Sequence, residues 1–162
     1  MGGEIEIRQA DFSRLEDRSA FLKLLQYYAQ TPLGAAGRLA AEVESVLVDR
    51  WQVHPGAFSL IAWQAGLGVG LANCLTSFST FRAQPRINIH DLVVLAAFEG
   101  QGVGRCLIDA VVQEAHQRGA CQITLEVRED NVRAHGLYQR YGFQGLEGGH
   151  RVFFGTLPIA DS

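Results

Sequence analysis

Lysine is almost absent from this sequence. Lys23 is the only lysine among 14 basic residues, and 17 acidic residues leave a formal net charge of −3. Domains that bind nucleic acid through its phosphates usually carry clustered basic residues and an excess of positive charge. The composition therefore predicts that the protein has no nucleic-acid partner.

Cysteine is also scarce, since the chain has only Cys74, Cys106 and Cys121. None of them forms a Cys-x-x-Cys pair, and none lies at metal-ligand spacing from a histidine. We therefore expect no metal site. A small, odd number of cysteines is typical of a protein of the reducing cytosol, so we expect a cytoplasmic protein.

Long hydrophobic runs are missing. No apolar stretch approaches the roughly 20 residues that span a bilayer, so no membrane association is expected. The first residues, Met1 to Glu6, lack the basic and apolar regions of a signal peptide. Only four prolines occur, and we find no repeat and no Pro/Ser-rich linker. The sequence therefore predicts a single domain over residues 1–162.

What is present is a globular composition, 48% hydrophobic and 19% charged. Alternating or continuous apolar residues predict strands at residues 4–8, 58–64, 70–78, 87–95, 122–127 and 152–156. Helical spacing predicts a helix capped by Asp11 or Ser13 and carrying Leu15, Phe21, Leu22, Leu24 and Leu25. A second helix is expected to bury Leu39, Val43, Val46 and Leu47, and two more follow at about 103–117 and 131–141. This order of elements predicts a mixed α/β fold.

Two glycine-rich turns organise the middle of the chain. Ala65-Gly66-Leu67-Gly68 separates two strands and predicts a hairpin. Leu92 to Leu95 is continuously apolar, as in a strand buried on both faces, and it runs into a glycine-rich loop that opens a helix.

That loop, Phe98 to Arg105, contains Gly100, Gly102 and Gly104. A helix that starts in such a loop presents unpaired N–H groups and the positive end of its dipole, which suits a phosphate or pyrophosphate. A tight connection between strand and helix, without a ligand, is the alternative. The loop is not a P-loop, which needs Gly-Lys-Ser/Thr, and it does not complete Gly-x-Gly-x-x-Gly.

A second segment with chemical potential runs from Asn131 to Phe143. Asn131 is a suitable N-cap, and Ala134 and Tyr138 share one face of the helix that follows. A phenol on that face could donate a proton to a leaving group. The alternative is an amphipathic helix in which Tyr138 simply lies at the edge of the packed face.

Together, the two segments resemble the GNAT superfamily of N-acetyltransferases. The family's loop reads roughly Val-x-Pro-x-x-Arg/Gln-Gly-x-Gly-x-Gly/Ala, which residues 94–104 follow. Its later helix reads Asn-x-x-Ala-x-x-Leu-Tyr-x-x-x-Gly-Phe. The residues matching that helix are Asn131, Ala134, Leu137, Tyr138, Gly142 and Phe143. Two positions depart from the family pattern: Glu99 replaces Arg or Gln, and Ala96 replaces Pro.

The resemblance implies a mixed central sheet with helices on both faces and a protein that transfers acetyl from acetyl-CoA to a primary amine, here expected to be that of a small molecule. A non-catalytic CoA-binding module is the alternative, and the sequence is compatible with a homodimer. The implied contacts to acetyl-CoA come from Leu92, Val93, Val94, Glu99, Gly100, Gln101, Gly102, Val103, Gly104, Arg105, Asn131 and Ala134. No metal is implied.

The resemblance also assigns catalytic roles. Tyr138 matches the family's general acid for the departing thiolate. The amine must lose a proton before it attacks, and His90 is favoured as the base because histidine titrates near neutral pH. Neighbouring residues of a strand point to opposite faces, so only one of His90 and Asp91 can face the cleft. Asp91 or a water relay is the alternative base.

Overall fold

The computed structural model describes residues 3–34 and 37–146, and the chain divides into two compact units, Met1–Arg128 and Glu129–Ser162. The first unit contains β1 (Glu6–Gln9), α1 (Leu15–Gln30), α2 (Ala41–Gln52), β2 (Ala57–Gln64), β3 (Leu67–Ser79), β4 (Gln84–Val94), a 3₁₀ turn η1 (Ala96–Phe98), α3 (Val103–Gln117) and β5 (Ile123–Leu125). The second unit contains α4 (Val132–Tyr141). The strand expected at 152–156 lies outside the described residues.

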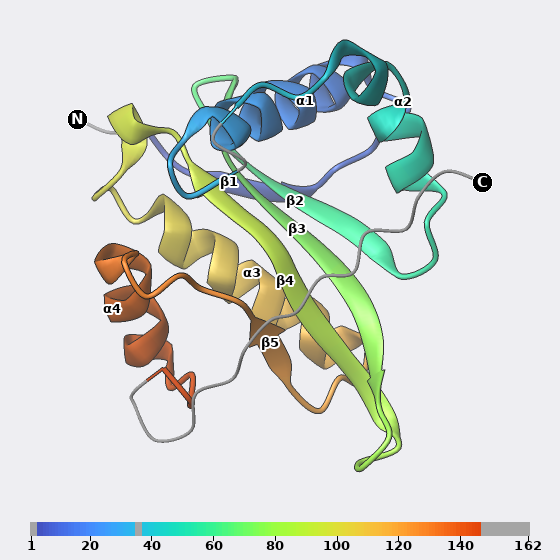
Figure 1. Cartoon of the computed structure of the whole chain (residues 1–162), viewed down its shortest axis with the longest axis vertical. Coiled ribbons are helices and arrows are strands. Elements are labelled where there is room, and N and C mark those ends of the chain that lie inside the picture. Colours follow the sequence, from blue (N-terminus) through green and yellow to red (C-terminus); the bar gives the residue numbers. More distant parts are fainter. Residues whose placement is uncertain (1–2, 35–36, 147–162) are drawn as a thin grey trace. The chain divides into compact units, whose positions relative to one another are not determined.

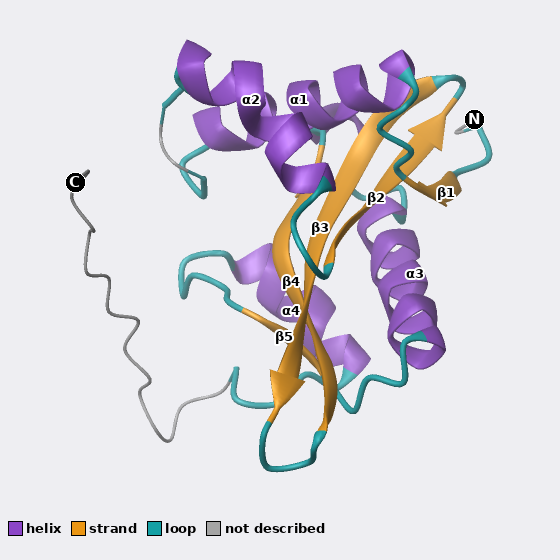
Figure 2. Cartoon of the chain, turned by 90° about the vertical axis from the view of Figure 1, so that its right-hand side faces the viewer, coloured by secondary structure: helices purple, strands orange, loops and turns teal. Residues whose placement is uncertain are grey.

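The strands form one sheet in the order β1-β2-β3-β4-β5 (Figure 1). Neighbouring strands are antiparallel except for β4 and β5, which are parallel. Helices α1 and α2 cover one face of the sheet and α3 covers the other (Figure 2). The expected mixed sheet with helices on both faces is therefore confirmed.

The β2–β3 hairpin forms where the glycine-rich turn predicts it. The turn itself is shorter than expected: only Ala65 and Gly66 lie outside the strands, with φ of +50° and +77°. Two left-handed residues make the kind of two-residue turn whose twist matches that of paired strands. Leu67 and Gly68 already belong to β3.

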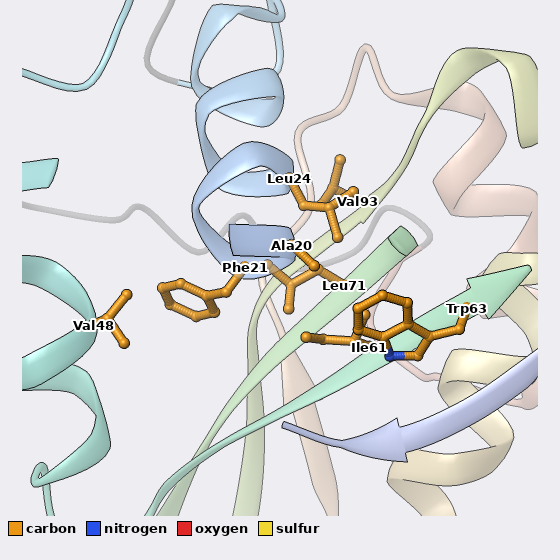
Figure 3. Close-up of a cluster of buried hydrophobic side chains, with 8 residues drawn as sticks. All are labelled: Ala20, Phe21, Leu24, Val48, Ile61, Trp63, Leu71 and Val93. Carbon is orange, nitrogen blue, oxygen red and sulfur yellow. The ribbon is translucent and has the colours of Figure 1, made fainter. Parts of the chain in front are cut away.

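The core between α1 and the sheet is built from large apolar side chains (Figure 3). Phe21 and Leu24 of α1 are almost completely buried against residues of three strands. The residues of this cluster are Ala20, Phe21, Leu24, Val48, Ile61, Trp63, Leu71 and Val93. Burying one side chain of this size typically contributes about 1.5–3 kcal/mol, so this cluster anchors α1 firmly over the middle strands.

On the opposite face, α3 lies very close to the sheet at Gly70. A Cβ atom there would lie 2.9 Å from Val103 Cγ1 and 3.1 Å from Leu107 Cδ1. Glycine therefore permits the start of α3 to approach β3. The apolar face expected for this helix is confirmed by buried Val103, Leu107 and Val111.

The start of α1 differs from the expectation. The helix begins after Arg14 and has no side-chain cap, so neither Asp11 nor Ser13 caps it. Asp11 instead accepts hydrogen bonds from Ser13, and buried Asp17 accepts one from the Asp11 N–H at 2.8 Å. The Asp17 carboxylate lies in the first turn, where the helix dipole favours a negative charge, but it caps no helical N–H. Leu15, expected in the apolar face, is exposed because it precedes the part of α1 that packs on the sheet.

The face of α2 was also predicted wrongly in part. Leu39 precedes the helix and Val43 is exposed, whereas Val48 is the residue that enters the core. The helix packs mainly through its second half, so the first apolar positions of its periodic pattern have no partner. Strand β5 is likewise shorter than the expected 122–127. Within residues 3–34 and 37–146, no helix is long and apolar enough to cross a membrane.

Candidate active site

Strand β4 contains a β-bulge at His90. Asp91 pairs with Asn73 and Ile89 pairs with Cys74, so His90 is an extra residue without a partner in the register. On its other edge, β4 pairs with β5 only from Ile87 to Ile89. The two parallel strands therefore separate at the bulge, and the rest of β4 has no neighbouring strand on that edge among the described residues.

This open edge exposes hydrogen-bonding groups of β4. Leu95 N–H donates to Val69 O at 2.9 Å, so Leu95 faces β3. Residues alternate along an antiparallel pair, which directs the backbone groups of Leu92 and Val94 to the opposite, open edge. Among the described residues no backbone partner is recorded for them there. The edge can accept an extended ligand as an added strand.

The expectation that this stretch is buried on both faces holds only for Val93, which packs in the α1 core. Leu92 and Val94 are half-buried. Beyond Ile89 no strand lies beside β4 on this edge among the described residues, so the side chains here have fewer neighbours. The apolar run thus reflects a surface at the opening between two strands.

The glycine-rich loop follows directly after η1. Gly100 and Gly102 have φ of +76° and +89°, and Gly102 is the residue before α3. A Cβ at either position would meet nothing within 4 Å, so glycine serves the left-handed backbone here. The first helical bond of α3 is from Cys106 N–H to Gly102 O, at 3.0 Å.

The loop presents a row of free amides. In the described part of the chain, the backbone N–H groups of residues 100 to 104 have no hydrogen-bond acceptor. They lie at the start of a 15-residue helix, whose dipole favours an anion there. This arrangement fits a phosphate or pyrophosphate.

The side chains around the loop are charged or form hydrogen bonds within the loop. Gln101 Nε2 donates to Ala97 O at 3.0 Å, which closes the loop on itself. Arg105 lies 3.9 Å from Asp109 on the next turn of α3, and both are exposed. Glu99 is exposed at the head of the loop. The negative charge of Glu99 therefore stands beside the free amides.

Sequence reasoning missed a contact that holds the start of η1. Ala96 N–H donates to the hydroxyl of Tyr27 in α1, at 3.1 Å. The two residues are 69 positions apart, and no sequence pattern links them. This hydrogen bond ties the junction between β4 and the loop to the helix layer.

It also missed a row of polar side chains in the sheet. Ser59, Asn73 and Asp91 are register partners on β2, β3 and β4, and hydrogen bonds join them to each other and to Trp51 of α2. The pKa of Tyr28 in α1 is raised, first by burial of its phenol and second by the negative charge of Asp91. The positive charge of Arg128 lowers this pKa in part. His90, the predicted base, is exposed at the bulge. The alternation used to separate His90 from Asp91 does not hold across a bulge.

The second unit carries the predicted cap and phenol. Asn131 Oδ1 accepts from Ala134 N–H at 3.2 Å, so the predicted N-cap is confirmed. Gly142 ends α4 with φ of +85°, which agrees with the predicted end of this helix at about residue 141. Tyr138 is buried, and its ring centroid lies 5.5 Å from that of Phe143.

Comparison with known proteins agrees with this geometry. The sequence model of the "Acetyltransferase (GNAT) family" matches residues 21–143. The chain is 29% identical over 140 residues to the uncharacterized N-acetyltransferase YhfO of Bacillus subtilis, covering 86% of this chain and 90% of that one. It is 35% identical over 85 residues to thialysine N-epsilon-acetyltransferase of Bos taurus, covering 51% of this chain and 49% of that protein.

Solved structures agree on the fold. One of them is AAC(6')-Iy in complex with the bisubstrate analog CoA-S-monomethyl-acetylneamine, which has a TM-score of 0.77 and 18% identity. The superposition covers 97% of this chain and 100% of that chain. Because the family model spans most of the sequence and the fold is shared, this chain belongs to the acetyltransferase (GNAT) family of enzymes.

Proposed function

We propose that the protein transfers the acetyl group of acetyl-CoA to a primary amine of a small molecule. The observation that carries the proposal is the open edge of β4 followed at once by the loop of free amides. An extended, amide-containing arm and a pyrophosphate are joined in CoA in the same order. The edge and the loop thus offer successive contacts for one ligand.

Each part of this surface has a distinct role in binding. Leu92 and Val94 hold the pantetheine arm through their backbone groups, with Val93 between them fixed in the core. The amides of Gly100 to Gly104 hold the pyrophosphate, and Arg105 stands on the first turn of α3 beside them. Glu99 opposes the ligand's charge, so the backbone amides provide most of the attraction.

The same edge assists the reaction. Acetyl-CoA supplies an activated acetyl group as a thioester. A backbone N–H of β4, from Leu92 or Val94, donates to the thioester oxygen and stabilises the negative charge that develops on it. The amine nitrogen forms a bond to the carbonyl carbon, and the bond from that carbon to sulfur breaks.

Tyr138 is proposed as the general acid because it occupies the tyrosine position of the family's helix motif. Its phenol gives a proton to the departing sulfur, and solvent restores that proton. Asn131 and Ala134 shape the first turn of the same helix. The nitrogen releases its proton to His90, to Asp91 or to water.

Two named proteins support a small-molecule acceptor. One relative is named for thialysine, and the bound analog in a structural neighbour carries acetylneamine. Both names refer to amines of low molecular weight. The acceptor of this chain is therefore sought first among diamines, amino acids and aminoglycosides.

Calorimetry with CoA and a CoA-release assay test the proposal. We expect the wild-type protein to bind CoA, and to release it from acetyl-CoA in the presence of thialysine, neamine or spermidine. A protein that binds CoA and acetylates none of these, nor any amino acid or peptide, would support a binding module instead. A folded protein that does not bind CoA would overturn the proposal.

A further inference from the structure

A row of hydrogen-bonded polar side chains crosses the sheet on its α1 face. Trp51 Nε1 donates to Ser59 Oγ at 2.9 Å, Ser59 Oγ donates to Asn73 Oδ1 at 2.6 Å, and Asn73 Nδ2 donates to Asp91 Oδ2 at 3.0 Å. Ser59 and Asn73 are each 1% exposed. Burying polar groups is unfavourable unless they are hydrogen-bonded, and here each group has its partner in the row.

The chemistry of the groups sets the direction of the row. An indole N–H can only donate, so the Ser59 hydroxyl accepts from Trp51 and donates its own O–H to Asn73 Oδ1. The amide oxygen of Asn73 is occupied by that bond, and its NH₂ group therefore faces Asp91. Every donor in the row points toward the Asp91 carboxylate, which can only accept when it is ionised.

Asp91 is the last residue of the hydrogen-bonded row. It is half-buried, and it follows His90 at the bulge, where β5 parts from β4. Over residues 3–34 and 37–146, its second oxygen, Oδ1, has no hydrogen-bond donor and no ion-pair partner. Asn73 therefore holds the Oδ2 atom of the carboxylate, and the Oδ1 atom can accept a hydrogen bond from a ligand.

We propose that Asp91 binds the positively charged ammonium of the acceptor through Oδ1, and that Asn73 is a positioning residue that orients Asp91 for this contact. The inference rests on the proposed function and narrows its substrate class to cationic amines. Asp91 lies at the opening between β4 and β5, on the strand whose edge is assigned to the thioester. An ammonium held there is brought to the acetyl group.

Tyr28 forms part of the same surroundings. It lies in α1, is half-buried, and feels the negative charge of Asp91. A phenol ring in the electrostatic reach of a carboxylate suits an alkylammonium, because its methylene groups can contact a ring while its charge is attracted to an oxygen. Arg128 acts on Tyr28 with the opposite sign, because its positive charge lowers the pKa of the phenol.

The test compares binding of the acceptor with binding of CoA. Neamine, thialysine and spermidine serve as probes, with KM and kcat measured for the best of them and its Kd measured on the CoA-bound protein. Asp91→Asn should raise KM and Kd of the amine about 10–100-fold, as expected for a lost charged hydrogen bond. Asn73→Ala should raise them about 5–10-fold, and Ser59→Ala should have a smaller effect in the same direction.

Thr76→Val is the matched control. Thr76 lies on β3, three residues from Asn73, and its buried hydroxyl has no partner in the described structure. Its removal should leave amine and CoA binding unchanged. In all variants the Kd of CoA should stay within about twofold of wild type, because the row does not touch the loop. If Asn73→Ala does not fold, Ser59→Ala and Trp51→Phe test the same row.

Three results would overturn the inference. The first is an Asp91→Asn protein that binds the amine like wild type. The second is a set of row variants that behave like Thr76→Val while Asp91→Asn is impaired, which removes the positioning role. The third is a wild type that binds CoA but uses only uncharged amines, which leaves the proposed function intact. A wild type that does not bind CoA overturns the proposed function itself.

Discussion

Tyr27 of α1 accepts a hydrogen bond from the Ala96 N–H at 3.1 Å, at the point where β4 ends and the loop begins. The GNAT loop motif has proline at the position of Ala96, and proline has no N–H to satisfy. Here the additional N–H has a partner in another layer of the fold. The hydroxyl of Tyr27 holds the backbone at this junction through a hydrogen bond, whereas a proline ring would hold it by restricting φ.

This hydrogen bond predicts that two single variants weaken CoA binding and that combining them restores it. Tyr27→Phe leaves the Ala96 N–H without its partner, and Ala96→Pro places the ring where the Tyr27 hydroxyl lies. Each single variant should weaken CoA binding about 3–10-fold, as for one hydrogen bond of about 1 kcal/mol. Ala96 is the first residue of η1 after extended Leu95, a setting that accepts proline.

The double variant carries neither defect. Calorimetry with CoA should therefore place Tyr27→Phe/Ala96→Pro closer to wild type than either single variant. Additive losses in the double variant would show that the hydroxyl and the Ala96 N–H are not coupled.

The left-handed backbone at Gly102 leads to a second prediction. Gly102→Ala forces an L-residue to φ of +89°, which costs about 1–2 kcal/mol or moves the loop. Gly119→Ala is the matched control, since Gly119 has φ of +64° at the other end of α3. Both should lower the melting temperature by similar amounts, but only Gly102→Ala should weaken CoA binding. Equal CoA affinity in the two variants would remove the loop from the binding site.

Glu99 should oppose the pyrophosphate. Glu99→Gln removes one negative charge beside the amides of α3, and it should tighten CoA binding about 2–5-fold at low salt. The gain should shrink as salt screens the charge. Glu42→Gln, in the first turn of α2, is the control and should change nothing. Weaker CoA binding by Glu99→Gln would mean that the carboxylate helps to build the loop.

Tyr138→Phe separates chemistry from packing. The ring that contacts Phe143 is retained and only the hydroxyl is lost, so the melting temperature and CoA affinity should barely change. Loss of a general acid typically costs about 10²–10⁴ in rate, and we expect the lower end because a thiolate leaves readily. Tyr141→Phe on the same helix should retain wild-type kcat. Equal kcat in both variants would mean that sulfur departs without help from Tyr138.

Cys74 predicts how stability depends on pH. Burial raises the pKa of its thiol to about 12, from an ordinary value of 9.0. Between these values the unfolded chain loses the proton while the folded chain keeps it. The contribution to stability is therefore complete below pH 9 and falls as pH rises toward 12, by up to about 1.4 kcal/mol per pH unit. Denaturant unfolding should show a flatter decline for Cys74→Ala above pH 9, whereas parallel curves would contradict the assignment.

Local signals accounted for much of the fold. Asn131 and Gly142 bracket α4 because a side-chain cap and a left-handed glycine act within a few residues of the helix they bound. The same is true of the turn at Ala65 and Gly66 and of the apolar face of α3. The loop and the Tyr138 helix were recognised through their resemblance to the GNAT motifs, each of which lies within one short segment.

Structural features that depend on residues far apart in the sequence could not be predicted from it. The bulge at His90 arises from how β4 fits β3, and it overturned the alternation that separated His90 from Asp91. The positions of Val43 and Val48 were misjudged because the period of α2 is the same whichever half of the helix meets the sheet.

The sequence by itself determined the order of the elements, the cap of α4 and the glycine loop, since each depends on backbone preferences and on neighbours within a turn or a strand. Only the tertiary structure decided that Tyr27 holds Ala96 and that Asn73 holds Asp91. Such hydrogen bonds join groups brought together by packing of α1 and by register across β3 and β4. Their energy depends on distance and burial, which no residue spacing in the sequence encodes.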